Sequence, residues 1–195
     1  MMNTAEVLKI FQQHRSNALV VPGRGGRHWV GISTQPNRDA PLGDPSMGGH
    51  AAFALGLALA RPDEKVVVFD SEGDLMMSMG VLATIAEQKP KNFYHFLLDN
   101  ECYATTGGQP VPNAKSVRYD ALALAAGYPA AHAFDNLETF SINVPRILAA
   151  PGPVFIALKI APEVNNTPIG QRKKWQTRKP VEALADMQRE LGISR

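Results

Sequence analysis

Three segments of the chain are apolar at nearly every position, without alternation between apolar and polar residues. They are "KVVVFD" (residues 65–70), "FYHFLLDN" (residues 93–100) and "PVFIALKI" (residues 153–160). Continuous apolar runs of this length predict strands that are buried on both faces of a sheet. Two weaker segments, "NALVVPG" (residues 17–23) and "PAAHAF" (residues 129–134), also predict extended chain.

Segments with helical spacing of apolar residues, or rich in small residues, lie between these strands and at the two ends. We expect helices at residues 4–15, 44–62, 77–88, 120–126, 136–149 and from 180 onward. Thr4 can cap the first helix, and Asp44 or Ser46 can cap the second. Strands that alternate with helices predict an α/β fold, with a doubly wound, mostly parallel sheet and helices on both faces.

Composition narrows the class of protein. A length of 195 residues with 45% apolar residues is typical of one folded domain, which we assign to residues 1–195, with a C-terminal tail and helix over 162–195. A net charge of +2 and the lack of a long apolar run give no reason to expect a nucleic-acid or membrane partner. The single cysteine, Cys102, excludes an internal disulfide, so we expect a cytoplasmic protein.

Acidic and amide side chains follow two of the predicted strands. Glu72 and Asp74 come after the strand at 65–70, and Asn100 ends the strand at 93–100. Ligands bind beyond the carboxyl ends of parallel strands, and carboxylate and amide oxygens suit Mg²⁺, which completes its shell with phosphate. Glycine-rich turns at residues 22–27 and 46–49 could supply N–H donors to a phosphate. The residues therefore predict a metal–diphosphate site, with solvated turn acids as the alternative.

Five ordered blocks, within "SMGGHAAFALGLALARPDEKVVVFDSEGDLMMSMGVLATI" and "LLDNECYATTGGQP", carry a family resemblance. The chain resembles the diphosphate-binding (PP) domain of thiamine-diphosphate enzymes over residues 18–160. Within that group it is most similar to phosphonopyruvate decarboxylases and to the beta subunits of sulfopyruvate decarboxylases. The resemblance implies the thiamine-diphosphate-binding fold, with thiamine diphosphate and Mg²⁺ as cofactors.

The metal turn of that family reads Gly-Asp-Gly. The resemblance places Glu72 at its aspartate, Gly73 at its second glycine, Asn100 at the second ligand and the backbone carbonyl of Cys102 at the third. A shifted alignment makes Asp74 the ligand instead. In the preferred alignment Asp74 stands where relatives carry a small residue close to the diphosphate.

The resemblance also assigns residues to the cofactor itself. Met47 matches the bulky residue that holds the cofactor bent, Pro45 offers its carbonyl to the aminopyrimidine, and Ser46 and Gly48 complete that turn. Tyr103, after the metal loop, is expected to line the substrate side.

A second turn, "PGRGGR", lies where relatives have a threonine-rich phosphate turn. Gly23 and Arg24 are its expected cofactor contacts, and the threonines are missing. We hypothesise that Arg24 or Arg27 compensates by pairing with the diphosphate or with Asp74.

The resemblance implies that this chain is the PP-domain subunit of a thiamine-diphosphate-dependent 2-oxo acid decarboxylase. Such an enzyme is a carboxy-lyase, here expected to act on a sulfopyruvate- or phosphonopyruvate-like acid. No catalytic residue is expected in this chain, because the activating glutamate comes from a pyrimidine-binding (PYR) domain on a partner subunit. We therefore expect a hetero-oligomer of the α₂β₂ type, with self-association. The alternatives are another thiamine-diphosphate reaction, carboligation or oxidation, and a cofactor-binding protein without catalysis.

A few other residues have a structural and a functional interpretation. His50 could face substrate or be a structural histidine, and Met77 and Met79 are expected in the core. Cys102 is expected to act through its backbone and not as a nucleophile. We interpret the basic run at 172–174 as a solvated tail, or as a binding site for an acidic partner or an anionic substrate.

Overall fold

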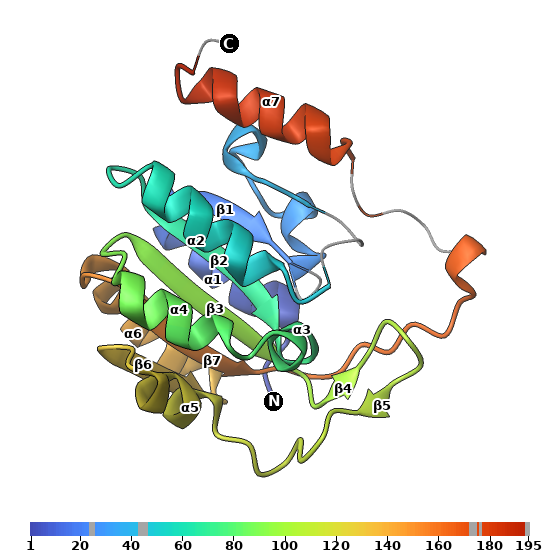
Figure 1. Ribbon diagram of the computed structural model, residues 1–195. Helices are drawn as coiled ribbons and strands as arrows, with labels where there is room; N and C mark the ends of the chain where they lie inside the picture. Colours follow the sequence, from blue (N-terminus) through green and yellow to red (C-terminus); the bar gives the residue numbers. More distant parts are fainter. Residues whose placement is uncertain (24–25, 43–46, 172–174, 176, 194–195) are drawn as a thin grey trace.

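The fold is built on one five-stranded parallel sheet (Figure 1). A computed structural model describes residues 1–23, 26–42, 47–171, 175 and 177–193. The strands lie in the order β1-β2-β3-β7-β6. Their bounds are β1 (Leu19–Pro22), β2 (Val66–Ser71), β3 (Phe93–Asp99), β6 (Ala130–Phe134) and β7 (Val154–Lys159). The predicted α/β class and the parallel sheet are confirmed.

Helices cover both faces of the sheet, as expected for a doubly wound fold (Figure 1). One face packs on α1 (Thr4–His14) and α6 (Leu137–Ala149). The other face packs on α2 (His50–Ala60), α4 (Val81–Gln88) and α5 (Tyr119–Ala126).

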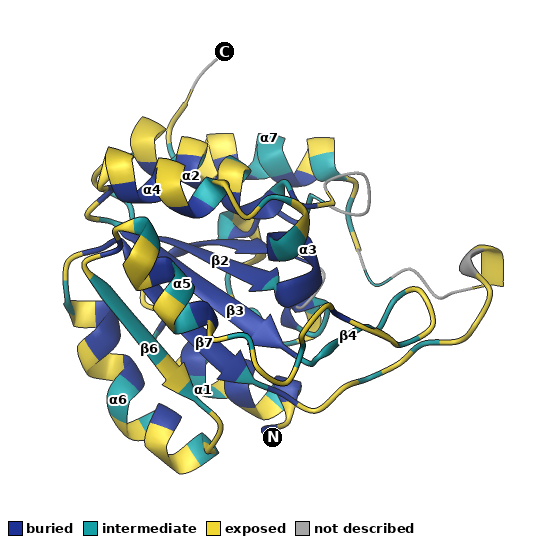
Figure 2. Cartoon of the chain, turned by 60° about the horizontal axis from the view of Figure 1, so that its bottom comes forward, coloured by how far each residue is buried: buried dark blue, intermediate teal, exposed yellow. Residues whose placement is uncertain are grey.

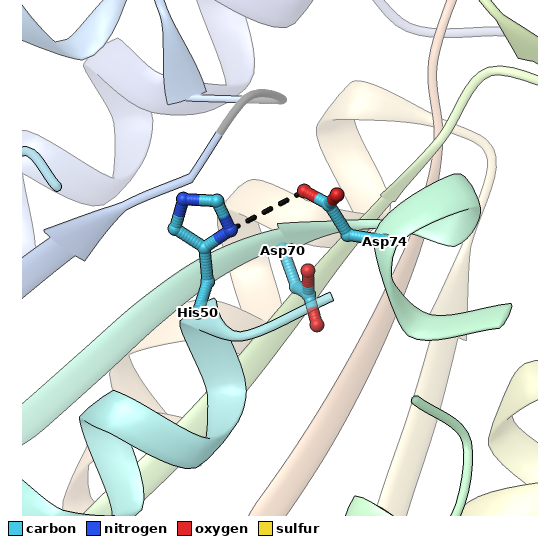
Figure 3. A group of neighbouring side chains, drawn as sticks. All are labelled: His50, Asp70 and Asp74. Carbon is cyan, nitrogen blue, oxygen red and sulfur yellow. Dashed lines mark ion pairs between the residues drawn. The ribbon is translucent and has the colours of Figure 1, made fainter. Parts of the chain in front are cut away.

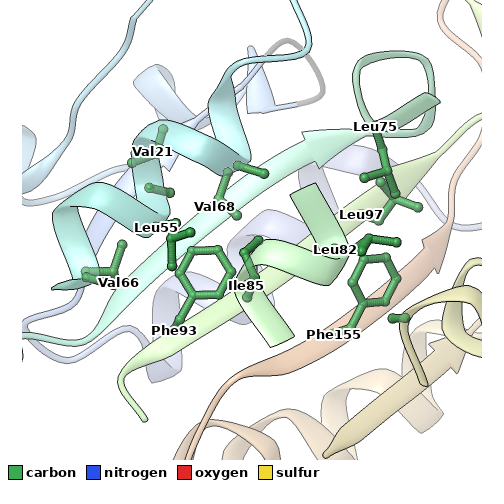
Figure 4. Packing of buried hydrophobic residues seen from close by; sticks show 14 of the residues in the cluster. Val21, Leu55, Val66, Val68, Leu75, Leu82, Ile85, Phe93, Leu97 and Phe155 are labelled. Carbon is green, nitrogen blue, oxygen red and sulfur yellow. The ribbon is translucent and has the colours of Figure 1, made fainter. Parts of the chain in front are cut away.

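The strand interiors explain the continuous apolar runs. In β2, Val66 and Val68 join the apolar cluster on the α2 side, and Val67 and Phe69 join the cluster on the α1 side. Figure 4 shows this packing on the α2 side, and Figure 2 shows β2, β3 and β7 buried, β6 mostly intermediate, and the helices with an exposed outer face. Because both faces are covered, a strand needs apolar residues at successive positions.

A short helix stands where the sequence predicted a turn. Helix α3 (Glu72–Met77) follows β2 directly, and the helix predicted over 77–88 starts only at α4. The hydroxyl of Ser71 accepts a hydrogen bond from the Asp74 N–H at 3.3 Å and so caps α3. Carboxylates in the first turn also stabilise a helix N-terminus. Glu72 and Asp74 are therefore helical residues.

The other helix starts differ in smaller ways. Asn3, not Thr4, caps α1, because its Oδ1 accepts the Glu6 N–H at 3.1 Å. Helix α2 begins at His50, after Gly49, without a side-chain cap. The two predicted caps, Asp44 and Ser46, lie outside the described residues.

Several short elements were not predicted. A small antiparallel hairpin joins β4 (Cys102–Tyr103) to β5 (Gln109–Pro110). Single 3₁₀ turns occur at η2 (Trp29–Gly31), η3 (Pro36–Arg38) and η5 (Ile169–Gln171).

The last helix, α7 (Pro180–Glu190), packs on its own chain and not away from it. Its Ala183 and Met187 are buried, and Arg178 just before it donates to the Pro36 carbonyl in η3. None of the helices in the described ranges has the length and apolar content needed to cross a membrane.

Candidate functional site

The ends of two neighbouring strands bring the predicted metal residues together. β2 pairs in parallel with β3, with Ser71 beside Leu98 at the carboxyl end. Glu72 and Asn100, which follow these strands, thus come to one edge of the sheet. A cavity of about 90 Å³ opens there. It is lined by Thr4, Arg27, His28, Met47, Ser71, Gly73, Asp74, Met77, Asn100, Cys102, Tyr103, Ala104, Thr105, Thr106, Ile160, Ala161 and Glu163.

Glu72 is joined to the loop after β3 by hydrogen bonds. Its carboxylate accepts the N–H of Asn100 at 3.3 Å and the N–H of Cys102 at 3.1 Å. The Asn100 amide oxygen accepts the same Cys102 N–H at 3.0 Å. The carbonyl of Cys102 accepts the Ala104 N–H at 2.9 Å. The three predicted ligand residues are therefore in direct contact.

The Glu72 carboxyl is in an environment that favours a cation. It is only 1% exposed, and burial raises its pKa to about 8, with nearby Asp99 adding to the rise. No ion pair to Glu72 is present among the described residues. A divalent cation would offset the cost of burying this charge. The oxygen donors of Glu72, Asn100 and Cys102 fit Mg²⁺.

Asp74 faces the opposite way from Glu72. Because Glu72 and Asp74 are two positions apart on a helix, their side chains are rotated by about 200° from one another about the helix axis. The Asp74 carboxylate accepts the Gly48 N–H at 3.2 Å and lies 3.3 Å from Nδ1 of His50 at the start of α2 (Figure 3). Arg27 pairs with Glu163 and not with Asp74, so this one of the hypothesised arginine pairings is wrong, while pairing with a diphosphate stays a prediction.

Two residues assigned to the cofactor border the cavity as expected. Met47 is 51% exposed at the cavity, so it is not a core residue. Tyr103 lies against Gly73, where an added Cβ would come within 2.9 Å of the ring. Gly48, next to Met47, has a φ of +71°, which favours glycine.

A group of charged side chains lines another part of the cavity wall. The guanidinium of Arg27 and the ring of His28 both bond the carboxylate of Glu163, His28 at 2.8 Å. Burial acts to raise the pKa of Glu163, but Arg27 and His28 more than offset it, so the pKa is lowered. Sequence reasoning missed Glu163, which stands in the segment read as a polar tail. The only sequence signal was its position just past the buried strand that ends near Ile160.

Some predicted site residues are placed elsewhere or lie outside the described ranges. Gly23 does not line the cavity: its N–H donates to the Phe69 carbonyl at 2.8 Å, and an added Cβ would lie 2.4 Å from that oxygen. The expected contacts Arg24, Pro45 and Ser46 fall outside the described residues, as does the basic run at 172–174.

Two other expectations concern methionines and the thiol. Met76, which we also expect in the core, packs against the apolar cluster on the α2 side, but Met77 and Met79 are 49% and 36% exposed, so their assignment to the core is wrong. Burial raises the pKa of the Cys102 thiol, and the nearby charges of Glu72 and Glu101 raise it further. A raised pKa keeps this thiol protonated and weakly nucleophilic.

Comparison with known sequences identifies relatives of this chain. Residues 27–158 match the family described as the C-terminal TPP-binding domain of thiamine pyrophosphate enzymes. The chain is 36% identical over 147 residues to the beta subunit of sulfopyruvate decarboxylase from Methanothermobacter thermautotrophicus, covering 75% of each chain. It is 40% identical over 117 residues to phosphonopyruvate decarboxylase from Streptomyces hygroscopicus, covering 60% of this chain. The match spans only 29% of that enzyme.

Solved structures give the same fold. A thiamin diphosphate-dependent enzyme from Mycobacterium smegmatis superposes with a TM-score of 0.66 over 83% of this chain and 32% of its own. At 18% sequence identity this likeness concerns the fold alone.

Proposed function

Since this chain belongs to the thiamine pyrophosphate enzymes through their C-terminal TPP-binding domain, we propose that it is the diphosphate-binding subunit of a 2-oxo acid decarboxylase. The observation that carries the proposal is the contact of Glu72 with Asn100 and Cys102 at the joined ends of β2 and β3. This contact supports the proposal, because oxygen donors of the kind that Mg²⁺ prefers meet at the carboxyl edge of the sheet, where Asn100 and Cys102 line the cavity.

In the proposed site, Glu72, the Asn100 amide oxygen and the Cys102 carbonyl hold Mg²⁺. Asp74 is the less favoured ligand, because its carboxylate turns toward Gly48 and His50 and away from Asn100. Magnesium held by so few protein oxygens takes its remaining ligands from the cofactor diphosphate and water.

The cavity wall supplies the rest of the proposed cofactor site. Met47 and Tyr103 border the cavity as apolar and aromatic surfaces, and Arg27 brings a guanidinium, which also bonds Glu163, to the same wall. Bound thiamine diphosphate would supply the carbanion chemistry that releases CO₂ from a 2-oxo acid. The role of this chain is to bind and orient the cofactor.

For the substrate we propose an anionic three-carbon 2-oxo acid. The two relatives are named for sulfopyruvate and phosphonopyruvate, which both carry a second anionic group. The Methanothermobacter relative is named as a beta subunit. We therefore propose that a partner subunit supplies the PYR domain and its activating glutamate.

The position of Asp74 in the sequence favoured an alternative function, that of a cofactor-binding protein without catalysis. One Asp74 oxygen accepts the Gly48 N–H and the other lies 3.3 Å from the His50 ring, so the carboxylate is turned toward α2, which argues against this alternative. Carboligation and oxidation use the same cofactor site, and product analysis with the partner present separates them from decarboxylation.

Calorimetry with thiamine diphosphate and Mg²⁺ tests the proposed site. We expect Mg²⁺-dependent binding to the wild type and at least tenfold weaker binding to Glu72→Gln. Glu87→Gln, the same change at an exposed position of α4, is the matched control and should bind like the wild type. Equal binding by the wild type and Glu72→Gln would refute the role of Glu72.

A further inference from the structure

A buried cluster of one imidazole and two carboxylates lies on the side of α3 that faces α2. His50, Asp70 and Asp74 are 1%, 2% and 3% exposed, and one ligand atom from each lies within 4.8 Å of the others. Figure 3 shows His50 and Asp74 facing each other across the end of β2, which carries Asp70. We propose that this cluster is a second cation site, which binds a zinc-class divalent ion.

The facing atoms of His50 and Asp74 have the spacing of two ligands on one ion. Nδ1 of His50 and Oδ2 of Asp74 are 3.3 Å apart, and neither atom has a hydrogen-bond partner in the described part of the chain. Two ligands held at ~2.0–2.1 Å in a tetrahedral zinc site are about 3.3–3.4 Å apart. Both side chains are thus buried, aimed at each other and already at the spacing that zinc requires.

Asp70 is held in the way that metal-binding carboxylates are held. Its Oδ2 lies 3.0 Å from Nε2 of His95, and its Oδ1 accepts the Ser71 N–H at 2.9 Å. His95 is fixed in turn by the hydroxyl of Tyr128, 3.2 Å from Nδ1. Carboxylates that bind metals are commonly oriented by such outer hydrogen bonds. Ligands of a tetrahedral zinc ion lie about 3.4 Å apart, so Asp70 needs to approach the other two ligands by up to about 1.4 Å.

The charge of the cluster also favours a cation. Two carboxylates are buried here, and within the described ranges their ion-pair partners are the imidazoles of His50 and His95, with no lysine or arginine. Burying unbalanced negative charge is costly, and a divalent ion balances it. Asp74 lines the cavity, which gives an ion a route to the cluster.

The ligand set indicates which ion would bind. An imidazole with two carboxylates suits zinc and its transition-metal neighbours, while the all-oxygen set around Glu72 suits magnesium. The two sites lie on different sides of α3. Binding at the His50 cluster does not depend on thiamine diphosphate, so its test is independent of the proposed function.

Cobalt titration of the chelator-treated chain tests the proposal, because Co²⁺ reports four-coordinate sites by its visible absorption. The titration is made in Glu72→Gln, so that the magnesium site does not contribute. We expect one equivalent of Co²⁺ with a four-coordinate spectrum that Zn²⁺ displaces. Adding His50→Gln should weaken this binding at least tenfold, while His132→Gln, on β6, should leave it unchanged.

A second variant covers the case in which His50→Gln does not fold. Asp74→Cys would place a thiolate at the same ligand position, and the bound Co²⁺ should then show an added sulfur-to-cobalt charge-transfer band. No four-coordinate Co²⁺ in Glu72→Gln would overturn the proposal. So would a spectrum that neither His50→Gln nor Asp74→Cys alters in a folded chain.

Discussion

At the scale of single residues, two acids separated by one glycine have different surroundings. Glu72 contacts the loop after β3, and Asp74 contacts the turn before α2. Sequence reasoning matched Glu72 to the metal position and noted that Asp74 was unusual. The direction of each side chain depends on α3, which the sequence pattern did not predict.

The raised pKa of Glu72 gives a pH dependence in the metal-free chain. Its pKa is about 8 when folded and 4.5 in the reference state, so folding takes up a proton between these values. The stability that the protonated Glu72 carboxyl contributes is fully present below pH 4.5 and is lost as the pH rises to about 8. We expect the free energy of unfolding to fall by of the order of 4 kcal/mol across this window.

Urea unfolding at several pH values, in the presence of a chelator, measures the slope of the free energy of unfolding against pH. Glu72→Gln removes the titrating group and should flatten it. An identical slope in Glu72→Gln would show that another group causes the pH dependence.

Gly73 is expected to tolerate a side chain poorly. In Gly73→Ala the new Cβ would lie 2.9 Å from the Tyr103 ring, which must then move at the cavity wall. Such crowding costs about 1–3 kcal/mol, so we expect lower stability and roughly tenfold weaker cofactor binding. Thermal unfolding and calorimetry measure the two effects.

Gly80→Ala is the control for that change, because nothing lies within 4 Å of an added Cβ there. It should unfold and bind cofactor like the wild type. If Gly73→Ala behaves like Gly80→Ala, the contact between Gly73 and Tyr103 does not shape the site.

At the scale of elements, the continuous apolar runs predicted β2, β3 and β7, because burial on both faces leaves a clear pattern, and weaker segments predicted β1 and the less buried β6. Helix α3 was missed since its sequence, "EGDLMM", has no apolar periodicity and begins with residues common in turns. The β4–β5 hairpin was missed because each strand has only two residues. Strand order was not predicted either, since pairing between distant segments leaves no local pattern.

Helix α2 offers a prediction about stability. Gly56 is exposed inside this helix, with open space around an added Cβ. Gly56→Ala should raise the free energy of unfolding by about 0.5–1 kcal/mol, because glycine is a poor helix former. Denaturant unfolding measures the change, and a loss of stability would mean that the position is not open.

At the scale of the whole molecule, the cavity is assembled from distant segments. Arg27 and His28 follow β1, Met47 precedes α2, and Glu163 follows β7. The family resemblance supplied residues that stand inside its motifs, such as Asn100. It gave no signal for contacts made across the fold, such as that of Arg27 with Glu163 or His50 with Asp74.

Dependence on a partner is also a property of the whole molecule. With thiamine diphosphate and Mg²⁺, the purified chain alone should release no CO₂ from sulfopyruvate or phosphonopyruvate, because the activating glutamate is proposed to come from the partner. A CO₂-release assay before and after adding a PYR-domain subunit measures this. Turnover by the chain alone would contradict the proposed division of labour.

We propose that this chain holds the magnesium diphosphate of the cofactor at the ends of β2 and β3. An amide NMR titration of the chain with thiamine diphosphate, with and without Mg²⁺, tests it most directly and detects weak binding. We expect shifts concentrated at Gly48, Gly73, Asn100 and Cys102 that require Mg²⁺ and are lost in Glu72→Gln. Shifts that are absent, lie elsewhere or persist without Mg²⁺ would contradict it.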